Sequence, residues 1–307
     1  MKIVVLDALT LGDVSWEKLE KLGNVVIYNT TKKHETVERI KDAEIVITNK
    51  VVIDKDVIDK AKNLKLIQIA ATGMDNVDVE YAKQKGIEVK NVVGYSTDSV
   101  VQLTFALVLG LICKIKYFDS YTREKYANGE IFTHISNWFE INGKTWGIIG
   151  LGNIGKKVAK LAQCFGAEVI YYSTSGKNFN KDFKRVNLDE LLKTSDIISI
   201  HAPLNNATKN LLNYEKLSLI KDGAVLINVG RGGIINEKDL AKILEEKDLK
   251  VGLDVYEKEP IDKHNPLLKF KDNTLLTPHI AWTSIEARNR LMEGIFKNIL
   301  EFLNKKG

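Results

Sequence analysis

Short apolar runs alternate along the chain with longer stretches in which apolar and charged residues recur at helical spacing. The apolar runs are rich in Val and Ile, and each of them predicts a buried strand. A first series of predicted strands covers 2–7, 24–28, 44–48, 64–70 and 87–90, and a second covers 144–150, 168–173, 196–201, 223–228, 250–255 and 273–277. Strands separated by helices are typical of parallel sheets built from βαβ units. The pattern therefore predicts an α/β protein with two doubly wound parallel-sheet domains.

Two helical stretches mark where the chain crosses between these domains. The apolar stretch 100–113 leads out of the first series, and the amphipathic stretch 283–303 follows the second. Thr283 and Glu286 have the spacing of a capping box, which predicts the start of the last helix. We expect this helix to return to the first domain. The expected domains are 1–98 plus 284–307 and 99–283.

The segment 117–143 has no strong helix or strand period, although Tyr, Phe and Trp recur along it. One interpretation is a long surface connection. Loops of this length are uncommon in compact domains and tend to be functional. We therefore expect an arm that buries its aromatic side chains against a second copy of the chain in a homodimer.

Composition and charge narrow the possible partners. The chain has 307 residues, of which 44% are hydrophobic and 28% charged, as in globular proteins. The net charge of +5 is spread along the sequence without the basic stripe of nucleic-acid-binding proteins, although it suits a small anionic substrate.

Cysteines and apolar runs bear on metals, membranes and the cellular compartment. Cys113 and Cys164 lie in apolar helical stretches and have neither disulfide nor metal-ligand spacing. Asp7 interrupts the N-terminal apolar run, and the stretch 100–113 is shorter than the roughly 20 residues that a membrane span needs. We expect no metal and no membrane partner, and a cytoplasmic protein.

A glycine-rich turn follows the predicted strand 144–150 and opens a helix. Gly150 permits the tight turn, Gly152 lets a pyrophosphate approach the backbone, and Gly155 lets helix and strand pack closely. A G-x-G-x-x-G spacing alone could be a merely tight turn, but the flanking strand and helix support dinucleotide binding. Asn153 and Ile154 belong to the same turn. The second domain is therefore expected to be of the Rossmann type, beside a Rossmann- or flavodoxin-like first domain.

The end of the next strand bears on the choice of dinucleotide. An acidic residue there would hold the ribose hydroxyls of NAD, but the position is occupied by Ser173. Ser173, Thr174 and Ser175 could donate hydrogen bonds to a 2′-phosphate, and Lys177 could supply charge. Alternatively, these residues form an ordinary polar loop. The expected cofactor is NAD or NADP, and the loop favours NADP.

Three motifs follow successive strands of the second series: "NVGRGG" (228–233), "LDVYEKEP" (253–260) and "LLTPHIAW" (275–282). They contribute Arg231, Glu259 and His279, with Asp254 close by. Each residue alone has a simpler explanation, as a solvated turn arginine, a surface glutamate or a loop histidine. Because all three follow a dinucleotide motif at strand ends, we interpret them as one site.

This set of side chains suits hydride transfer to a 2-keto acid. Arg231 can orient the substrate carboxylate and stabilise the developing alkoxide. His279 can donate the proton, and Glu259 can fix the tautomer of His279. We expect the active site to lie in a cleft between the two domains, which close because water must be excluded.

With these motifs, "QIAATGMDNVD" (68–78), "NVVGYSTDSVVQLTFAL" (91–107) and "HAPL" (201–204), the chain resembles the D-isomer-specific 2-hydroxyacid dehydrogenases over essentially its whole length. The resemblance implies Arg231, Glu259 and His279 as catalytic residues. It implies that the backbone of Thr72, Gly73 and Met74 holds the substrate carboxylate and that Asp254 orients the nicotinamide. It also implies that 117–143 is a dimerisation arm. The further residues expected at the cofactor are His201, Ala202, Pro203, Val229 and Gly230.

Within that family, the chain looks most like the glycerate dehydrogenases, or hydroxypyruvate reductases. The expected substrate is hydroxypyruvate or glyoxylate, giving D-glycerate or glycolate. Trp282 either shapes the substrate pocket or packs between domains, and Lys50 either lies at the pocket mouth or on ordinary surface. Two alternatives stay open: a dehydrogenase for another D-2-hydroxyacid such as D-lactate, and a non-enzymatic NAD(H)-sensing interaction protein.

Overall fold

A computed structural model describes residues 1–130 and 138–305. The chain divides into two compact units, the first made of Met1–Ser96 and Trp282–Gly307 and the second of Thr97–Ala281. The bounds expected from the sequence lie two residues away at each crossing. The predicted cleft between two domains stays a prediction.

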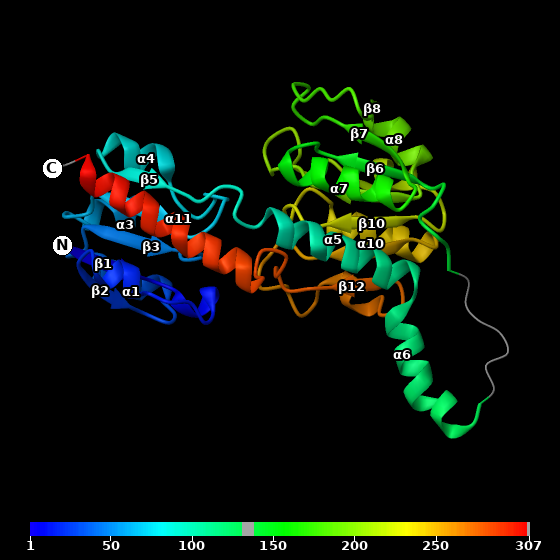
Figure 1. The fold of residues 1–307 in the computed structure, drawn as a ribbon, viewed down its shortest axis with the longest axis horizontal. Helices are drawn as coiled ribbons and strands as arrows, with labels where there is room; N and C mark the ends of the chain where they lie inside the picture. The colour runs from blue at the N-terminus through cyan, green and yellow to red at the C-terminus, as the bar shows by residue number, and fades with distance from the viewer. Residues whose placement is uncertain (131–137, 306–307) are drawn as a thin grey trace. The chain divides into compact units, whose positions relative to one another are not determined.

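The first unit is built on a five-stranded parallel sheet in the order β2-β1-β3-β4-β5 (Figure 1). Its strands are β1 (Lys2–Val5), β2 (Asn24–Ile27), β3 (Ile45–Thr48), β4 (Leu66–Ile69) and β5 (Glu88–Lys90). Its helices are η1 (Ala8–Leu11), α1 (Glu17–Glu20), η2 (Lys33–Glu35), α2 (Thr36–Ile40), α3 (Lys55–Lys60), α4 (Val79–Gln84) and α11 (Ile285–Asn304). This strand order is that of flavodoxin-like folds.

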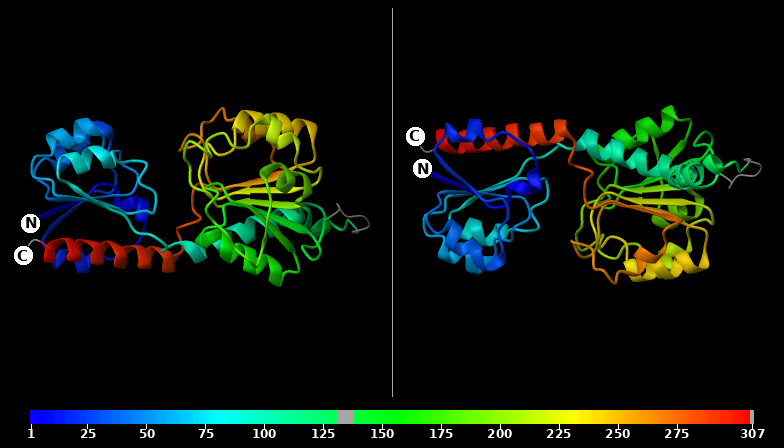
Figure 2. Two further views of the ribbon diagram at one scale, coloured as in Figure 1. Left: turned by 90° about the horizontal axis from the view of Figure 1, so that it is seen from above. Right: turned by 90° about the horizontal axis from the view of Figure 1, so that it is seen from below.

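Both faces of this sheet are covered by helices, as Figure 2 shows. Along β4, Leu66 faces a core shared with α11, whereas Ile67 and Ile69 face a core shared with α2, α3 and α4. Successive strand residues point to opposite faces, so a strand buried on both sides must be apolar throughout. Burial on both faces therefore explains the continuous apolar runs in the sequence.

The described residues of the second unit form a seven-stranded parallel sheet in the order β12-β11-β10-β9-β6-β7-β8. Its strands are β6 (Thr145–Ile149), β7 (Glu168–Tyr172), β8 (Lys184–Arg185), β9 (Ile197–Ile200), β10 (Val225–Asn228), β11 (Lys250–Leu253) and β12 (Thr274–Leu276). Its helices are α5 (Thr97–Ile112), α6 (Ile115–Glu124), η3 (Tyr126–Asn128), α7 (Asn153–Cys164), α8 (Leu188–Thr194), α9 (Tyr214–Ser218), α10 (Glu237–Glu246) and η4 (Pro266–Lys269). The order changes direction at β6, which lies between β7 and β9. Doubly wound sheets bind ligands at such a point, at the carboxyl ends of the strands.

The helices of this unit also form two layers (Figure 2). One core contains side chains of α5 and α7, and the other contains side chains of α8, α9 and α10. The apolar stretch at 100–113 is therefore explained by α5, which buries eight residues. The predicted fold class, with two doubly wound parallel sheets, is confirmed.

Two local predictions need correction, and one strand was missed. The last helix is capped by Ser284 rather than Thr283, because the Ser284 side chain accepts a hydrogen bond from the Ala287 backbone N–H at 3.2 Å. The two-residue strand β8 was not predicted, because it is too short to show a pattern. The segment 117–143 is not irregular throughout, because 115–124 form helix α6.

Helix α6 projects away from the sheet of its unit in Figure 1. It buries none of its residues, and its helical form is supported by contacts between neighbouring turns. Arg123 pairs with Asp119, and the rings of Tyr117 and Tyr121 stack at 6.3 Å. The remainder of the predicted arm includes 131–137, which lie outside the described residues.

Among the described residues, no single helix is long and apolar enough to span a membrane. The segments Thr97–Ile112 and Ile115–Asn128 meet that criterion only when taken together as a pair, bent by 54°.

Candidate active site

The glycine-rich turn joins β6 to α7 at the switch point of the larger sheet. Gly150 adopts a φ of 95°, a left-handed conformation that favours glycine, and its N–H donates to the Tyr172 carbonyl at 2.9 Å. A Cβ at Gly155 would lie 2.3 Å from the Gly150 oxygen, so this glycine is required for the helix to pack. Gly152 caps α7, whose first turn is formed by Asn153, Ile154 and Gly155.

The surroundings of this turn fit a bound dinucleotide. A Cβ added at Gly152 would meet no atom within 4 Å, so the backbone there faces open space through which a phosphate can approach. A Cβ at Gly150 would instead meet the backbone N of Ala202 at 2.9 Å, which places "HAP" (201–203) against the turn. Backbone N–H groups at a helix start favour an anion.

His201 adds a second observation in favour of a ligand. Burial lowers the pKa of His201 to about 3, so the imidazole is neutral. Its Nε2 lies 3.0 Å from the Ser199 hydroxyl, which also accepts a hydrogen bond from the Trp146 indole N–H. Its Nδ1 is buried and has no hydrogen-bond partner in the part of the chain that the structure describes. A buried polar atom without a partner is unfavourable unless a ligand or water completes it.

Ser173 directly follows β7, where the ribose of a dinucleotide is expected. Its side chain is buried, and its hydroxyl oxygen accepts a hydrogen bond from the Asn178 N–H at 3.3 Å. Thr174 is half-buried and Ser175 is exposed. The position therefore carries no negative charge.

Arg231 is presented by a turn after β10. The Asn228 amide braces this turn, because its Nδ2 donates to the Arg231 carbonyl at 2.9 Å and its Oδ1 accepts from the Gly230 N–H at 3.0 Å. A Cβ at Gly232 would lie 1.8 Å from the Tyr256 carbonyl oxygen, so only glycine lets this turn contact the next loop. The flanking glycines thus allow a large cation to project from closely packed backbone. The Arg231 Nη1 donates to the Gly230 carbonyl at 2.9 Å.

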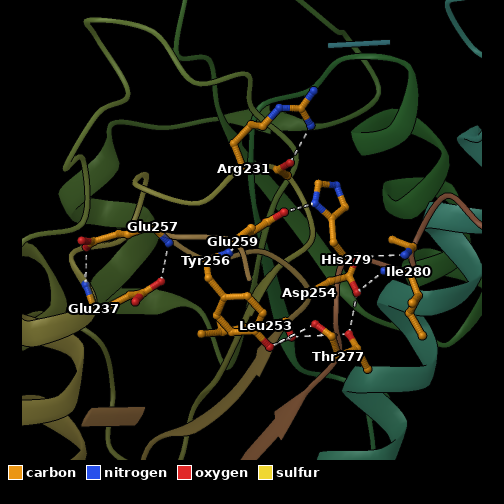
Figure 3. A network of polar contacts seen from close by, with 12 residues as sticks. Arg231, Glu237, Leu253, Asp254, Tyr256, Glu257, Glu259, Thr277, His279 and Ile280 are labelled. Carbon is orange, nitrogen blue, oxygen red and sulfur yellow. Dashed lines mark hydrogen bonds and ion pairs between the residues drawn. The ribbon is translucent and has the colours of Figure 1, made fainter. Parts of the chain in front are cut away.

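His279 and Glu259 are in direct contact (Figure 3). The His279 Nδ1 lies 2.6 Å from Glu259 Oε2, while Glu259 Oε1 accepts the Tyr256 N–H at 3.3 Å. With Nδ1 directed at a carboxylate, Nε2 is the nitrogen that can exchange a proton with a substrate. His279 has a φ of 57°, which is unusual for a residue with a side chain and marks a constrained loop.

Asp254 fixes the loop that carries His279. Its buried carboxylate accepts hydrogen bonds from the Thr277 hydroxyl at 2.6 Å and from the N–H groups of Ile280 and Ala281, both at 2.8 Å. Burial raises the pKa of Asp254 above its ordinary 3.8, and these hydrogen bonds oppose that rise. The structure thus gives Asp254 a supporting task that the sequence did not predict. Its contact with nicotinamide stays a prediction.

Arg231, Glu259 and His279 follow β10, β11 and β12, which are neighbours in the sheet. Parallel strands present their carboxyl ends at one edge, so residues distant in sequence meet there. Val229 and Gly230 lie in the turn after β10. The sequence interpretation missed a further pair behind Glu259, namely Glu237 and Glu257, whose carboxylates bind each other's backbone (Figure 3). No sequence spacing could have indicated it.

In the first unit, the predicted substrate residues lie at the ends of two neighbouring strands. Lys50 follows β3, and Thr72, Gly73 and Met74 follow β4. The two segments are joined, because the Asn49 amide donates to the Ala70 carbonyl at 2.6 Å. The Thr72 hydroxyl donates to the Val92 carbonyl at 2.9 Å.

Asp7, also missed as a site residue, shapes the loop that contains Lys50. Its buried carboxylate accepts backbone N–H groups of Asn49, Lys50 and Val51 at 2.6 to 3.2 Å. The only indication in the sequence was a charged residue at the end of an apolar strand.

Trp282 packs within the first unit. It borders the core that includes α11, and its ring meets that of Tyr95 edge-on at 6.4 Å. This packing neither tests nor requires the predicted role of Trp282 in the substrate pocket. Among the described residues, no group of three or more His, Cys, Asp or Glu side chains is arranged to hold a metal ion.

The chain is similar to known dehydrogenases. The family model for "D-isomer specific 2-hydroxyacid dehydrogenase, NAD binding domain" matches residues 105–281. The hydroxypyruvate reductase of Blautia hydrogenotrophica is 40% identical, over 99% of this chain and 97% of the relative.

Two solved structures are similar over the whole chain. An acyclic imino acid reductase in complex with NADPH and D-Arg has a TM-score of 0.88 and 34% identity, covering 100% of this chain and 98% of that one. The D-lactate dehydrogenase of Aquifex aeolicus in complex with NAD and lactic acid has a TM-score of 0.88 and 30% identity, covering 99% and 96%.

Proposed function

Because the chain belongs to the D-isomer-specific 2-hydroxyacid dehydrogenases, we propose that it reduces hydroxypyruvate to D-glycerate, and glyoxylate to glycolate, with NADH or NADPH. The observation that carries the proposal is the 2.6 Å contact between His279 and Glu259, in the loops after β12 and β11, while Arg231 follows the next strand of the sheet, β10. A proton donor and a fixed cation at the carboxyl edge of a dinucleotide-binding sheet are what reduction of a 2-keto acid needs.

When bound, the nicotinamide supplies a hydride to C2 of the keto acid. His279 donates the proton from Nε2 to the C2 oxygen, so that the ketone becomes a hydroxyl, and His279 regains its proton from solvent. Glu259 contacts Nδ1 and so keeps the imidazole oriented. Arg231 binds the substrate carboxylate with its planar fork and offsets the negative charge that develops on the C2 oxygen.

In the first unit, we assign substrate binding to the backbone of Thr72–Met74 and to Lys50. The support is their position at the ends of adjacent strands and the Asn49 bridge that joins their loops. Lys50 is an exposed cation, which suits an anionic substrate.

We further propose that the chain acts as a cytoplasmic homodimer. Helix α6 buries no residue, and Ile115, Tyr117 and Tyr126, on α6 and the adjoining η3, expose more than half of their surface. Large apolar side chains exposed together favour an interface with another protein. Both cysteines are free thiols, in keeping with a reducing compartment.

The test is the initial rate of hydroxypyruvate reduction with NADH and NADPH in parallel, compared with glyoxylate, pyruvate and a 2-imino acid. The proposal is supported if hydroxypyruvate is reduced faster than glyoxylate, pyruvate and the 2-imino acid. A preference for pyruvate would assign the chain to D-lactate instead. Tight dinucleotide binding without turnover of any of these acids would favour an NAD(H)-sensing protein.

A further inference from the structure

Arg185 lies beside the loop that follows β7. Strand β8 pairs in parallel with β7, and the register places Arg185 opposite Tyr171. The carboxyl ends of both strands therefore lie at the same edge of the sheet. The Arg185 Nη1 donates to the Gly176 carbonyl at 3.1 Å, which holds the guanidinium against this loop.

The loop itself has a defined shape. The Gly176 N–H donates to the Ser173 carbonyl at 3.1 Å, which closes a turn with Thr174 and Ser175 at its centre. On the far side, the hydroxyl oxygen of the buried Tyr171 accepts the Asn180 N–H at 3.0 Å. Two hydroxyls are therefore presented at the tip of a braced turn.

The charge around this turn is positive. Residues 173–186 contain four basic side chains, Lys177, Lys181, Lys184 and Arg185, and one acidic side chain, Asp182. Lys184 is paired with Glu190 at 3.0 Å. Within the described part of the chain, neither Arg185 nor Lys177 forms an ion pair with a carboxylate. Both are exposed and available to an anion.

We propose that Arg185, together with Thr174, Ser175 and Lys177, binds the 2′-phosphate of NADP(H), so that the chain prefers NADPH over NADH. This inference rests on the proposed function, which requires a dinucleotide at the switch point. In dinucleotide-binding sheets, the loop after the second strand faces the ribose: an acidic residue there selects NAD, and a nearby arginine accommodates the phosphate.

Two features of this chain carry the assignment. First, the acid is replaced by Ser173, whose buried hydroxyl already accepts a backbone N–H. Second, arginine binds phosphate through two parallel N–H groups, and Arg185 donates to the loop through Nη1. The remaining N–H groups can contact the phosphate while the loop contact persists.

The experiment measures the Kd of NADPH and of NADH by calorimetric titration without substrate, for the wild type and for Arg185→Gln. Glutamine removes the charge and keeps a polar amide, although its side chain ends two bonds short of the Arg185 Nη1. The matched control is Lys184→Gln, which removes the same charge from the neighbouring position of the same strand, where the side chain points to the opposite face.

We expect the wild type to bind NADPH at least about tenfold more tightly than NADH, as a charge-assisted contact implies. Arg185→Gln should weaken NADPH roughly ten- to hundredfold and leave NADH unchanged, which also shows that the variant is folded. Lys184→Gln should change neither affinity. Arg185→Lys, which keeps the charge and loses the fork, should weaken NADPH by less than Arg185→Gln does.

Equal affinity of the wild type for the two dinucleotides, or an unchanged NADPH affinity in Arg185→Gln, would overturn the inference and leave the proposed function intact. Failure of the wild type to bind either dinucleotide would overturn the proposed function itself, and the inference with it.

Discussion

Glu237 and Glu257 exchange two hydrogen bonds, because the carboxylate of each accepts the backbone N–H of the other, at 2.6 and 2.8 Å. The second oxygen of Glu237 accepts from the Asn265 amide at 2.5 Å. These contacts tie the first turn of α10 to the loop that carries Glu259 (Figure 3). The position of the histidine partner is thus set by a pair of residues that do not touch the histidine.

Glu237→Ala is expected to loosen this loop. The Glu257 N–H loses its acceptor, so the free energy of unfolding should fall by about 1–3 kcal/mol, and kcat should fall because Glu259 is held less well. The Kd of NAD(P)H should not change, since the glycine turn lies elsewhere. Glu237→Gln keeps one acceptor oxygen and should recover most of the loss. An alanine variant with unchanged stability and unchanged kcat would show that the pair has no positioning role.

Asp254→Asn is expected to weaken the loop around His279. An amide has one acceptor oxygen, so whichever way it is oriented, the backbone N–H of Ile280 or of Ala281 faces an N–H₂ group. The unpaired donor should cost about 1–3 kcal/mol in the free energy of unfolding at neutral pH. Urea denaturation followed by circular dichroism measures it. Asp272→Asn is a control outside the site, at an exposed carboxylate, and should leave the free energy of unfolding unchanged.

The pH dependence of the same variant has a defined sign. Burial raises the pKa of Asp254 above its ordinary 3.8, so the folded state binds this proton more tightly than the unfolded chain does. The part of the stability that comes from this pKa difference is therefore fully present below that ordinary value and is lost as the pH rises through the folded pKa, whereas the backbone hydrogen bonds to the carboxylate remain. The stability difference between wild type and Asp254→Asn should narrow from pH 4 to pH 8. A difference that widens over this range would contradict the assigned direction.

Arg231→Ala is expected to remove transition-state stabilisation. The loss in kcat/KM should be about 10²- to 10³-fold, the scale of a single oxyanion contact. Arg231→Lys should recover little of the lost kcat/KM, because lysine lacks the planar fork. Lys65→Ala, at an exposed lysine paired with Glu44 in the first unit, controls for loss of charge. Turnover close to normal in the Arg231 variants would remove this residue from the chemistry.

Alanine at two glycines of the same turn should have opposite effects. At Gly152 the new methyl group meets no protein atom, so the melting temperature should stay constant while the affinity for NAD(P)H falls, because the methyl occupies the space of the pyrophosphate. At Gly155 the methyl would lie 2.3 Å from the Gly150 oxygen, so stability should fall by about 1–3 kcal/mol. Thermal unfolding measures the loss of stability and dinucleotide titration measures the loss of affinity, so together they distinguish the two variants. A Gly152→Ala variant that binds normally would place the phosphates elsewhere.

The sequence predicted most strands of both sheets, because a strand buried on two faces must be apolar along its length. It did not predict β8, whose two residues are both charged, nor α6, whose helix rests on contacts between its own turns rather than on a buried face. It also placed the start of the last helix one residue early, since Thr283 and Ser284 are both acceptable caps.

At the site, Arg231, Glu259 and His279 could be proposed because each follows a recognisable strand. The residues that support them could not. Asp254 was expected to face the cofactor, but its partners at 277–281 become visible only in three dimensions. The same holds for Glu237 and Glu257, where the start of α10 contacts a loop twenty residues further along the chain.

The strand order of the larger sheet has a consequence for how such a protein can change. The residues proposed to choose the coenzyme lie in the loop after β7 and on β8, at one end of the sheet, whereas Arg231, Glu259 and His279 follow β10, β11 and β12 at the other. Strands β9 and β6 lie between the two groups in the sheet formed by the described residues. Mutations that exchange one coenzyme for the other therefore need not alter the acid or the cation, and the two traits can evolve, or be engineered, one at a time.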